Sequence, residues 1–226
     1  MTVTGEAERR AERRQTLGEE IANSVSHGAV LLAAMAGTPF LVAHAARHGD
    51  WLNVVGASVF AVCIVLLYFT SMLYHALPAS RRAKRLFQLL DHSAIYLMIA
   101  GTYTPFTLGV LRGRWGWTLL GLIWTMALAG VVLKAVAGLR FPRISTAIYL
   151  AMGWIVVIAA EPMWQRMPGW GLVWLVAGGL AYTLGVAFYA TDWRLRYGHF
   201  VWHLFVAAGT ACHFIAVLNY AFRPVR

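Results

Sequence analysis

Long apolar stretches, separated by short polar or Gly- and Pro-containing breaks, occupy most of this chain. A helix that crosses the hydrocarbon core of a bilayer needs about 20 predominantly apolar residues. The stretches that approach this length run from Ser24 to Ala46, Leu52 to Leu77, Leu86 to Leu108, Trp115 to Leu133, Ile144 to Ala160, Gly169 to Ala190, and His199 to Ala221. The pattern therefore predicts an all-α, polytopic membrane protein built as a bundle of seven transmembrane helices.

The segment before the first apolar stretch is polar, with alternating Arg and Glu in EAERRAERRQTLGEE. It contains neither an apolar run nor a small-residue cleavage site, so it does not resemble a signal peptide. We expect residues 1–20 to form a polar cytosolic N-terminal tail. Residues 21–226 are predicted to form a single seven-helix membrane domain, because the connecting segments are too short for a second domain.

Composition and charge support this interpretation and give it an orientation. Of the 226 residues, 60% are apolar and 12% are charged, and mean hydropathy is +0.63, whereas soluble domains have about 25% charged residues. If the N-terminus is inside, 13 of the 19 Lys and Arg residues flank the spans on the cytoplasmic side. This bias favours a cytoplasmic N-terminus and an outside C-terminus. The net charge of +10 follows largely from it, so we expect no nucleic-acid partner.

Several polar side chains fall inside the predicted spans, where ionisable groups are costly and usually functional. In the predicted topology they share the cytoplasmic half of the bilayer: His27, Ser71, His75, Asp91, His92, His199 and His203. At 1.5 Å of rise per residue, Asp91 and His203 lie only about 6 to 8 Å inside their helix starts. The sequence thus predicts one shallow polar layer.

Spacing within this layer suggests a metal site. His199 and His203 are four residues apart, as are Ser71 and His75, so each pair lies on one helical face. Two His at this spacing can bind one ion, and three His with an open fourth position are typical of catalytic zinc. A hydrogen-bonded cluster without metal is the alternative. His27 and His92 could each either contact a metal ligand or serve only as a polar group in helix packing. His213 is expected to form a hydrogen bond with a neighbouring helix instead of binding metal.

Five motifs carry a family resemblance: EEIANSVSHG, which contains Glu20, Asn23 and His27; SMLYH at Ser71 to His75; LLDHSAIY around Asp91; GTYTPF from Gly101; and HFVWHLFVAAGTACHF from His199. With these motifs the chain resembles the hemolysin III proteins, the bacterial branch of the progestin and adiponectin receptor superfamily, which is also similar to the alkaline ceramidases. The resemblance implies a seven-helix fold with a cytosolic N-terminus, in the bacterial cytoplasmic (inner) membrane.

At the site, the resemblance implies zinc (Zn²⁺) bound by three histidines, with a carboxylate and a hydroxyl supporting a water molecule. By motif, His75, His199 and His203 would be the ligands, and Asp91 and Ser71 would be the catalytic pair. His27, His92 and Asn23 would be supporting polar contacts around the ligands.

Three functions are compatible with these predictions. The first is a zinc-dependent hydrolase-like protein that acts on an acyl lipid at the cytoplasmic leaflet, with a membrane lipid or free fatty acid as its partner. The second is a non-enzymatic lipid or membrane-fluidity sensor in which zinc is structural. The third, a cytolytic pore, is disfavoured because the chain is already integral to the membrane and has no separate insertable amphipathic segment.

Overall fold

Every regular element in the described part of the chain is a helix, which confirms the predicted all-α class. The computed structural model describes residue 13 and residues 15–222. In chain order the elements are α2 (Leu17–His48), α3 (Trp51–Ala76), α4 (Arg82–Leu108), α5 (Arg114–Ala137), α6 (Pro142–Trp154), the 3₁₀ helix η1 (Ile155–Ala159), α7 (Ala160–Arg166), α8 (Gly169–Thr191), α9 (Gly198–Ala216) and the π-helical turn η2 (Val217–Ala221).

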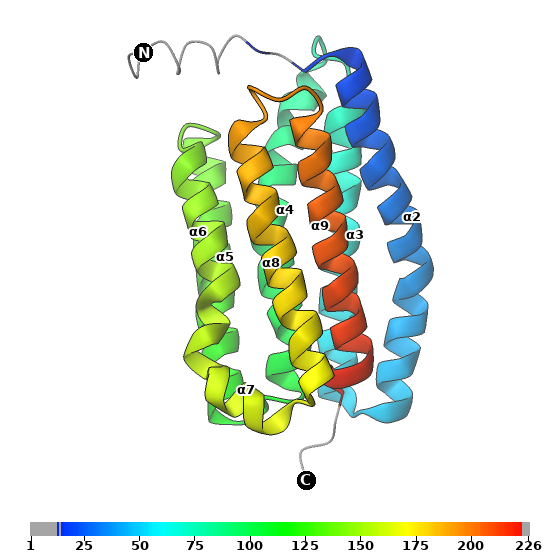
Figure 1. The fold of residues 1–226 in the computed structure, drawn as a ribbon, viewed down its shortest axis with the longest axis vertical. Helices are drawn as coiled ribbons and strands as arrows, with labels where there is room; N and C mark the ends of the chain where they lie inside the picture. Colours follow the sequence, from blue (N-terminus) through cyan, green and yellow to red (C-terminus); the bar gives the residue numbers. More distant parts are fainter. Residues whose placement is uncertain (1–12, 14, 223–226) are drawn as a thin grey trace.

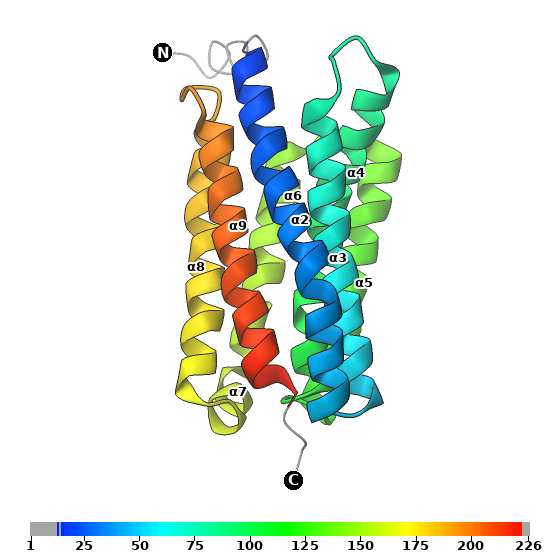
Figure 2. The same cartoon turned by 90° about the vertical axis from the view of Figure 1, so that its right-hand side faces the viewer.

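The long helices lie side by side in one bundle and alternate in direction (Figure 1). α3 packs between α2 and α4, α5 packs on α4, and α9 packs against both α8 and α2. Figure 2 shows α9 beside α2, so the last helix returns to the first. We refer below to the N-terminal end of the bundle, where α2, α4, α6 and α9 begin.

Within the described part of the chain, six helical segments are long and apolar enough to cross a membrane: Leu17–His48, Trp51–Ala76, Arg114–Ala137, Pro142–Arg166, Gly169–Thr191 and Gly198–Ala221. Their outward faces expose large apolar side chains such as Leu32, Phe40 and Val62. A soluble protein rarely exposes apolar surface continuously, whereas a lipid-facing surface requires it. The chain is therefore a multi-pass membrane protein.

Helix α4 is as long as the others but less apolar. It begins with charged residues and carries Thr102, Thr104 and Thr107 in its second half, all of them buried. Each threonine hydroxyl donates to a carbonyl of the preceding turn. These polar side chains face other helices and have internal acceptors, so α4 does not need the apolar surface of a lipid-facing helix.

Helix α2 begins at Leu17, earlier than the predicted span start at Ser24. Thr16 caps it: the Glu19 amide donates to the Thr16 hydroxyl at 3.3 Å, and the Thr16 amide donates to the Glu19 carboxylate at 2.9 Å. Such a capping box satisfies backbone amides that would otherwise lack partners. The last residues assigned to the polar tail from sequence are therefore helical, while residues 1–12 lie outside the described part.

The fifth predicted span, Ile144 to Ala160, is longer and less regular than expected. α6 passes into the 3₁₀ helix η1 and then into α7, which ends at Arg166. The Tyr103 hydroxyl on α4 lies at this junction, where it accepts from the Val156 amide at 3.0 Å and lies 2.9 Å from the Met152 carbonyl. A side chain from another helix thus supplies partners that the irregular backbone lacks.

Close helix packing depends on glycine where α5 meets α4. A Cβ at Gly130 would lie 2.4 Å from the Tyr96 ring, and Tyr96 is fully buried. By contrast, a Cβ at Gly121 on the same helix would meet no atom of another described helix within 4 Å. Only the first of these glycines sets a distance between helices.

An ion pair joins two connections at the opposite end of the bundle. Asp50 caps α3, accepting from the Leu52 and Asn53 amides, and Arg112 donates from Nη2 to the Asp50 carboxylate at 2.8 Å. This guanidinium lowers the pKa of Asp50 to about 2. The pair ties the α2 to α3 turn to the α4 to α5 connection.

Candidate metal centre

Three histidine rings from two helices meet at the N-terminal end of the bundle. His75 lies in the last turn of α3, and His199 and His203 lie in the first turns of α9. Their ligand atoms all lie within 4.8 Å of one another. His75 and His203 are 3% and 2% exposed. The structure therefore brings together the three histidines predicted from spacing, in a group that could hold a metal ion.

The start of α9 is held in place by the start of α2. Tyr197 adopts a left-handed conformation with φ of 60°, and its amide donates to the Glu19 carboxylate at 2.8 Å. The helix then begins at Gly198. This turn places His199 and His203 on the helical face toward α3, where they meet His75.

Each histidine has an oxygen acceptor at Nδ1. The distances are 2.7 Å from His75 to Glu20 Oε2, 3.1 Å from His199 to Asp192 Oδ2, and 3.3 Å from His203 to the Asn23 carbonyl. Carboxylates and carbonyls only accept, so these contacts favour the tautomer with the proton on Nδ1. The Nε2 lone pairs are then available to a metal, as in carboxylate–histidine–zinc arrangements.

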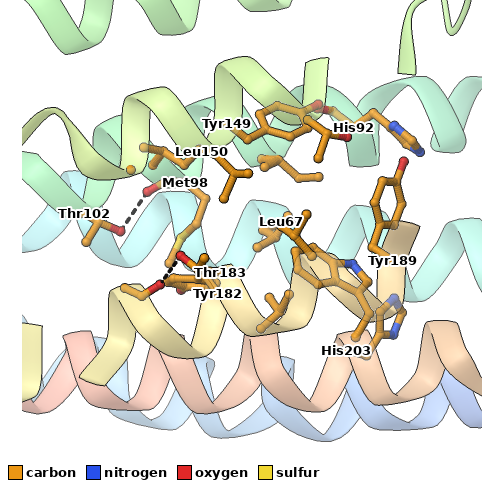
Figure 3. Close-up of a pocket in the computed structure, with 18 of the residues that line it drawn as sticks. Leu67, His92, Met98, Thr102, Tyr149, Leu150, Tyr182, Thr183, Tyr189 and His203 are labelled. Atoms are coloured by element: carbon orange, nitrogen blue, oxygen red, sulfur yellow. Dashed lines mark hydrogen bonds between the residues drawn. The ribbon is translucent and has the colours of Figure 1, made fainter. Parts of the chain in front are cut away.

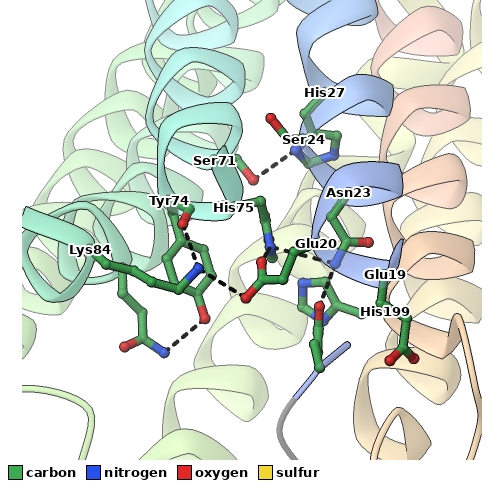
Figure 4. Close-up of polar contacts among 12 residues, drawn as sticks. Glu19, Glu20, Asn23, Ser24, His27, Ser71, Tyr74, His75, Lys84 and His199 are labelled. Atoms are coloured by element: carbon green, nitrogen blue, oxygen red, sulfur yellow. Dashed lines mark hydrogen bonds and ion pairs between the residues drawn. The ribbon is translucent and has the colours of Figure 1, made fainter. Parts of the chain in front are cut away.

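Glu20 is the most consequential residue that sequence reasoning left without a role. Its second oxygen accepts from Lys84 Nζ at 2.9 Å, and Lys84 also donates to the Tyr74 carbonyl (Figure 4). Glu20 thus links α2 to His75 and to the start of α4. The signal was present in the chain, since Glu20 lies three residues before Asn23 and seven before His27, on one face of α2. Asp192, in the turn before α9, carried no comparable signal.

His27 lies directly on the cluster. Its ring stacks on His203 with centroids 3.5 Å apart and planes 10° apart, and its Nδ1 lies 2.8 Å from the Ser71 hydroxyl. Asp91 is buried next to Ser71 and lines the same pocket. The structure therefore places the predicted carboxylate and hydroxyl beside the three histidines, with His27 between Ser71 and His203.

The two remaining predicted residues differ in their proximity to the cluster. Asn23 is fully buried, its carbonyl faces His203, and its Nδ2 lies 3.4 Å from His75 Nδ1. His92 lines the pocket but is not part of the histidine group, and its carbonyl accepts from the Tyr149 hydroxyl at 2.7 Å. Asn23 is thus a direct contact of the ligand candidates, and His92 is a pocket residue.

A largely apolar pocket extends from the cluster into the bundle (Figure 3). Its cavity volume is about 140 Å³, roughly ten times the space that a single water requires. Side chains of α4, α6, α8 and α9 line most of it, from Asp91 and His203 at one end to Thr102 and His213 at the other. The arrangement joins a polar, metal-ligating head to a long apolar cavity.

Fold and site together define a helical, multi-pass membrane protein with a buried three-histidine cluster. The family model described as Haemolysin-III related matches residues 15–214, and the chain belongs to this family. It is similar to Hemolysin-3 of Bacillus cereus, 42% identical over 213 residues, covering 94% of this chain and 96% of that protein.

More distant relatives extend the similarity to eukaryotes. Monocyte to macrophage differentiation factor of Homo sapiens is 28% identical over 218 residues, covering 93% of this chain and 87% of that protein. Heptahelical transmembrane protein ADIPOR2 of Oryza sativa subsp. japonica is 30% identical over 161 residues, covering 61% and 69%. These matches agree with the superfamily expected from the motifs.

Proposed function

We propose that this protein is a zinc-dependent, hydrolase-like membrane protein that acts on an acyl lipid at the cytoplasmic leaflet. One observation carries the proposal: three histidines, each with an acceptor at Nδ1, form one group, and two of them, His199 and His203, line the head of an apolar pocket together with Asp91. A lipid whose carbonyl reaches the cluster while its chain occupies the pocket fits this arrangement.

The donor set fits zinc. Imidazole nitrogen is a preferred zinc ligand, and three of them leave the fourth position open in a catalytic site. The buried Nε2 of His75 has no hydrogen-bond partner among the described residues, and a buried polar atom without a partner is costly. His75, His199 and His203 would hold the ion. When bound, zinc would polarise a carbonyl oxygen and increase the acidity of a water molecule.

The neighbouring residues supply the remaining parts of a hydrolysis. Asp91 would orient the attacking water and accept its proton, and the Ser71 hydroxyl would stabilise negative charge on the carbonyl oxygen. Addition of water to an amide or ester would release a free fatty acid and an amine or alcohol. His27, through its contact with Ser71, would position that hydroxyl.

The proposal includes a seven-span topology with the N-terminus in the cytoplasm and the C-terminus outside, in the bacterial cytoplasmic (inner) membrane. The distribution of Lys and Arg supports the orientation. The 27 residues of α4 correspond to about 40 Å of helix, enough for a seventh span. The name of the rice relative contains the word heptahelical and supports the count, and the similarity to the Bacillus cereus protein supports a bacterial membrane.

The test uses purified full-length protein in detergent. We expect about one zinc per chain by metal analysis, less in His75→Ala, and hydrolysis of long-chain acyl amides or esters that is lost in Asp91→Asn. His48→Ala, on the exposed opposite end of α2, is the matched control and should keep both zinc and turnover. Metal-free wild type, or turnover retained in His75→Ala, would contradict the proposal. Zinc and lipid bound without turnover would assign the sensor function instead.

A further inference from the structure

His213 is a buried histidine at the far end of the pocket, away from the metal centre. Its Nε2 lies 3.2 Å from the Leu175 carbonyl of α8. A carbonyl only accepts, so Nε2 carries the proton and Nδ1 is an unprotonated acceptor. Nδ1 is buried and has no hydrogen-bond partner among the described residues, and His213 as a whole is only 9% exposed.

The ring is held in this orientation by close helix packing. A Cβ at Gly178 would lie 2.3 Å from the His213 ring, and the Tyr182 ring centroid is 5.5 Å away. His213 lines the same pocket as His203. Ten residues of helix separate them, which is about 15 Å along α9, a distance that an extended acyl chain of roughly twelve carbons spans.

The hydroxyl protons around this end of the pocket are committed to protein acceptors. Thr102 donates to the Met98 carbonyl and Thr183 to the Gly179 carbonyl, each within the helix. Thr210 donates to the Val206 carbonyl at 3.0 Å, so the Tyr182 hydroxyl, 2.8 Å from Thr210, must donate to it. The polar atoms that remain here are therefore acceptors (Figure 3 shows Thr102, Tyr182 and Thr183 around this part of the pocket).

We infer that the pocket end around His213 recognises a hydroxyl group on the bound lipid. A ligand that brings a donor satisfies the Nδ1 acceptor, whereas a plain methylene or a ketone leaves it unpaired. This inference rests on the proposed function, which puts the acyl carbonyl at the metal centre, and it narrows the substrate class. The preferred chain is a long acyl group that carries a hydroxyl about twelve carbons from its carbonyl.

The experiment compares three fatty acids of equal length as competitors of labelled octadecanoic acid on the purified, zinc-loaded protein: octadecanoic, 12-hydroxyoctadecanoic and 12-oxooctadecanoic acid. We expect the hydroxy acid to bind about 5- to 10-fold more tightly than the other two, as one additional hydrogen bond to a buried acceptor implies. The oxo acid is the matched control, since it has similar polarity but no donor.

His213→Phe removes the acceptor and keeps an aromatic ring, so it should abolish the preference while leaving the affinity for octadecanoic acid within about twofold. If His213→Phe does not fold, the comparison of the hydroxy and oxo acids on the wild-type protein still tests whether a hydroxyl donor on the ligand raises affinity. Equal affinities for all three acids would overturn the inference and leave acyl binding intact. No binding of any of them would overturn both the inference and the lipid-binding part of the proposed function.

Discussion

Removal of the Glu20 carboxylate should weaken zinc binding more than any other change outside the ligands themselves. Glu20 accepts from His75 Nδ1 at 2.7 Å and is held there by Lys84 at 2.9 Å. Loss of such a partner typically costs 10- to 100-fold in metal affinity, or about 1.4–2.7 kcal/mol. We therefore expect Glu20→Ala to raise the zinc Kd within this range.

Two further variants separate orientation from charge. Glu20→Gln keeps an oxygen that can accept from Nδ1 but loses the negative charge, so its effect should lie between wild type and Glu20→Ala. Asp192→Ala should weaken zinc binding less, below about 10-fold, because the His199 contact is longer, 3.1 Å, and the His199 side chain is 14% exposed against 1% for His75. Lys84→Met keeps the Glu20 carboxylate but removes the cation that holds it, so its effect on zinc affinity should be smaller than that of Glu20→Ala.

The assay is competition with a fluorescent zinc chelator at fixed pH in detergent, with thermal unfolding recorded for every variant. A Glu20→Ala protein that unfolds like wild type and binds zinc with unchanged affinity would refute the reasoning. A larger loss in Asp192→Ala than in Glu20→Ala would also refute it, since the order follows from distance and burial.

Three further predictions concern stability, measured by thermal unfolding in detergent. Gly130→Ala places a Cβ 2.4 Å from the Tyr96 ring on α4 and should destabilise the fold by about 1–3 kcal/mol. Gly121→Ala, with open space around it, should leave stability unchanged or raise it by up to about 1 kcal/mol. Equal effects of the two substitutions would show that close packing is not the cause. Thr210→Val removes the acceptor of the buried Tyr68 hydroxyl and of the part-buried Tyr182 hydroxyl, and the unpaired Tyr68 hydroxyl should cost about 1–3 kcal/mol, which a wild-type melting temperature would contradict. Arg112 lowers the pKa of Asp50 to about 2 from its ordinary 3.8, so the stabilisation by the ion pair is complete above pH 3.8 and is lost as pH falls toward 2. The difference in melting temperature between wild type and Asp50→Asn should therefore be constant above about pH 5 and shrink below about pH 4. A difference that does not depend on pH would exclude the ion pair as its source.

Residues whose roles follow from helical spacing could be predicted from the sequence. His199 and His203 are one turn apart on one helix, and His75 lies at the end of a span that reaches the same depth. To predict that the three side chains lie close together, it was enough to know the direction of each helix. The acceptors at Nδ1 could not be predicted in the same way. Helical spacing puts Glu20 on the face of α2 that carries Asn23 and His27, but its contact with His75 is set by how α2 packs on α3. Asp192 lies in a turn, where no helical spacing applies.

The same distinction applies to the spans. Apolar stretches predicted a helix at each long element, α4 and α6 included, but they say nothing about the 3₁₀ interruption after α6, which depends on a hydroxyl from α4. Mean hydropathy sets α4 apart from the six membrane-crossing segments of the described chain, because it carries threonines that are paired within the protein. High hydropathy is required where a helix faces lipid, and α4 is largely enclosed by other helices.

The 3₁₀ segment Ile155–Ala159 also resets the helical phase of the fifth segment. A 3₁₀ helix turns about 120° per residue and an α-helix about 100°, so five residues advance the azimuth by about 100° relative to a continuous α-helix. The pocket-facing stripe of α6 comprises Thr146, Tyr149, Leu150, Gly153 and Trp154, and within this segment none of the later residues lines the cavity. The cavity thus ends on this side where the backbone rotates, and we expect a one-residue insertion in η1 to change the depth of the cavity.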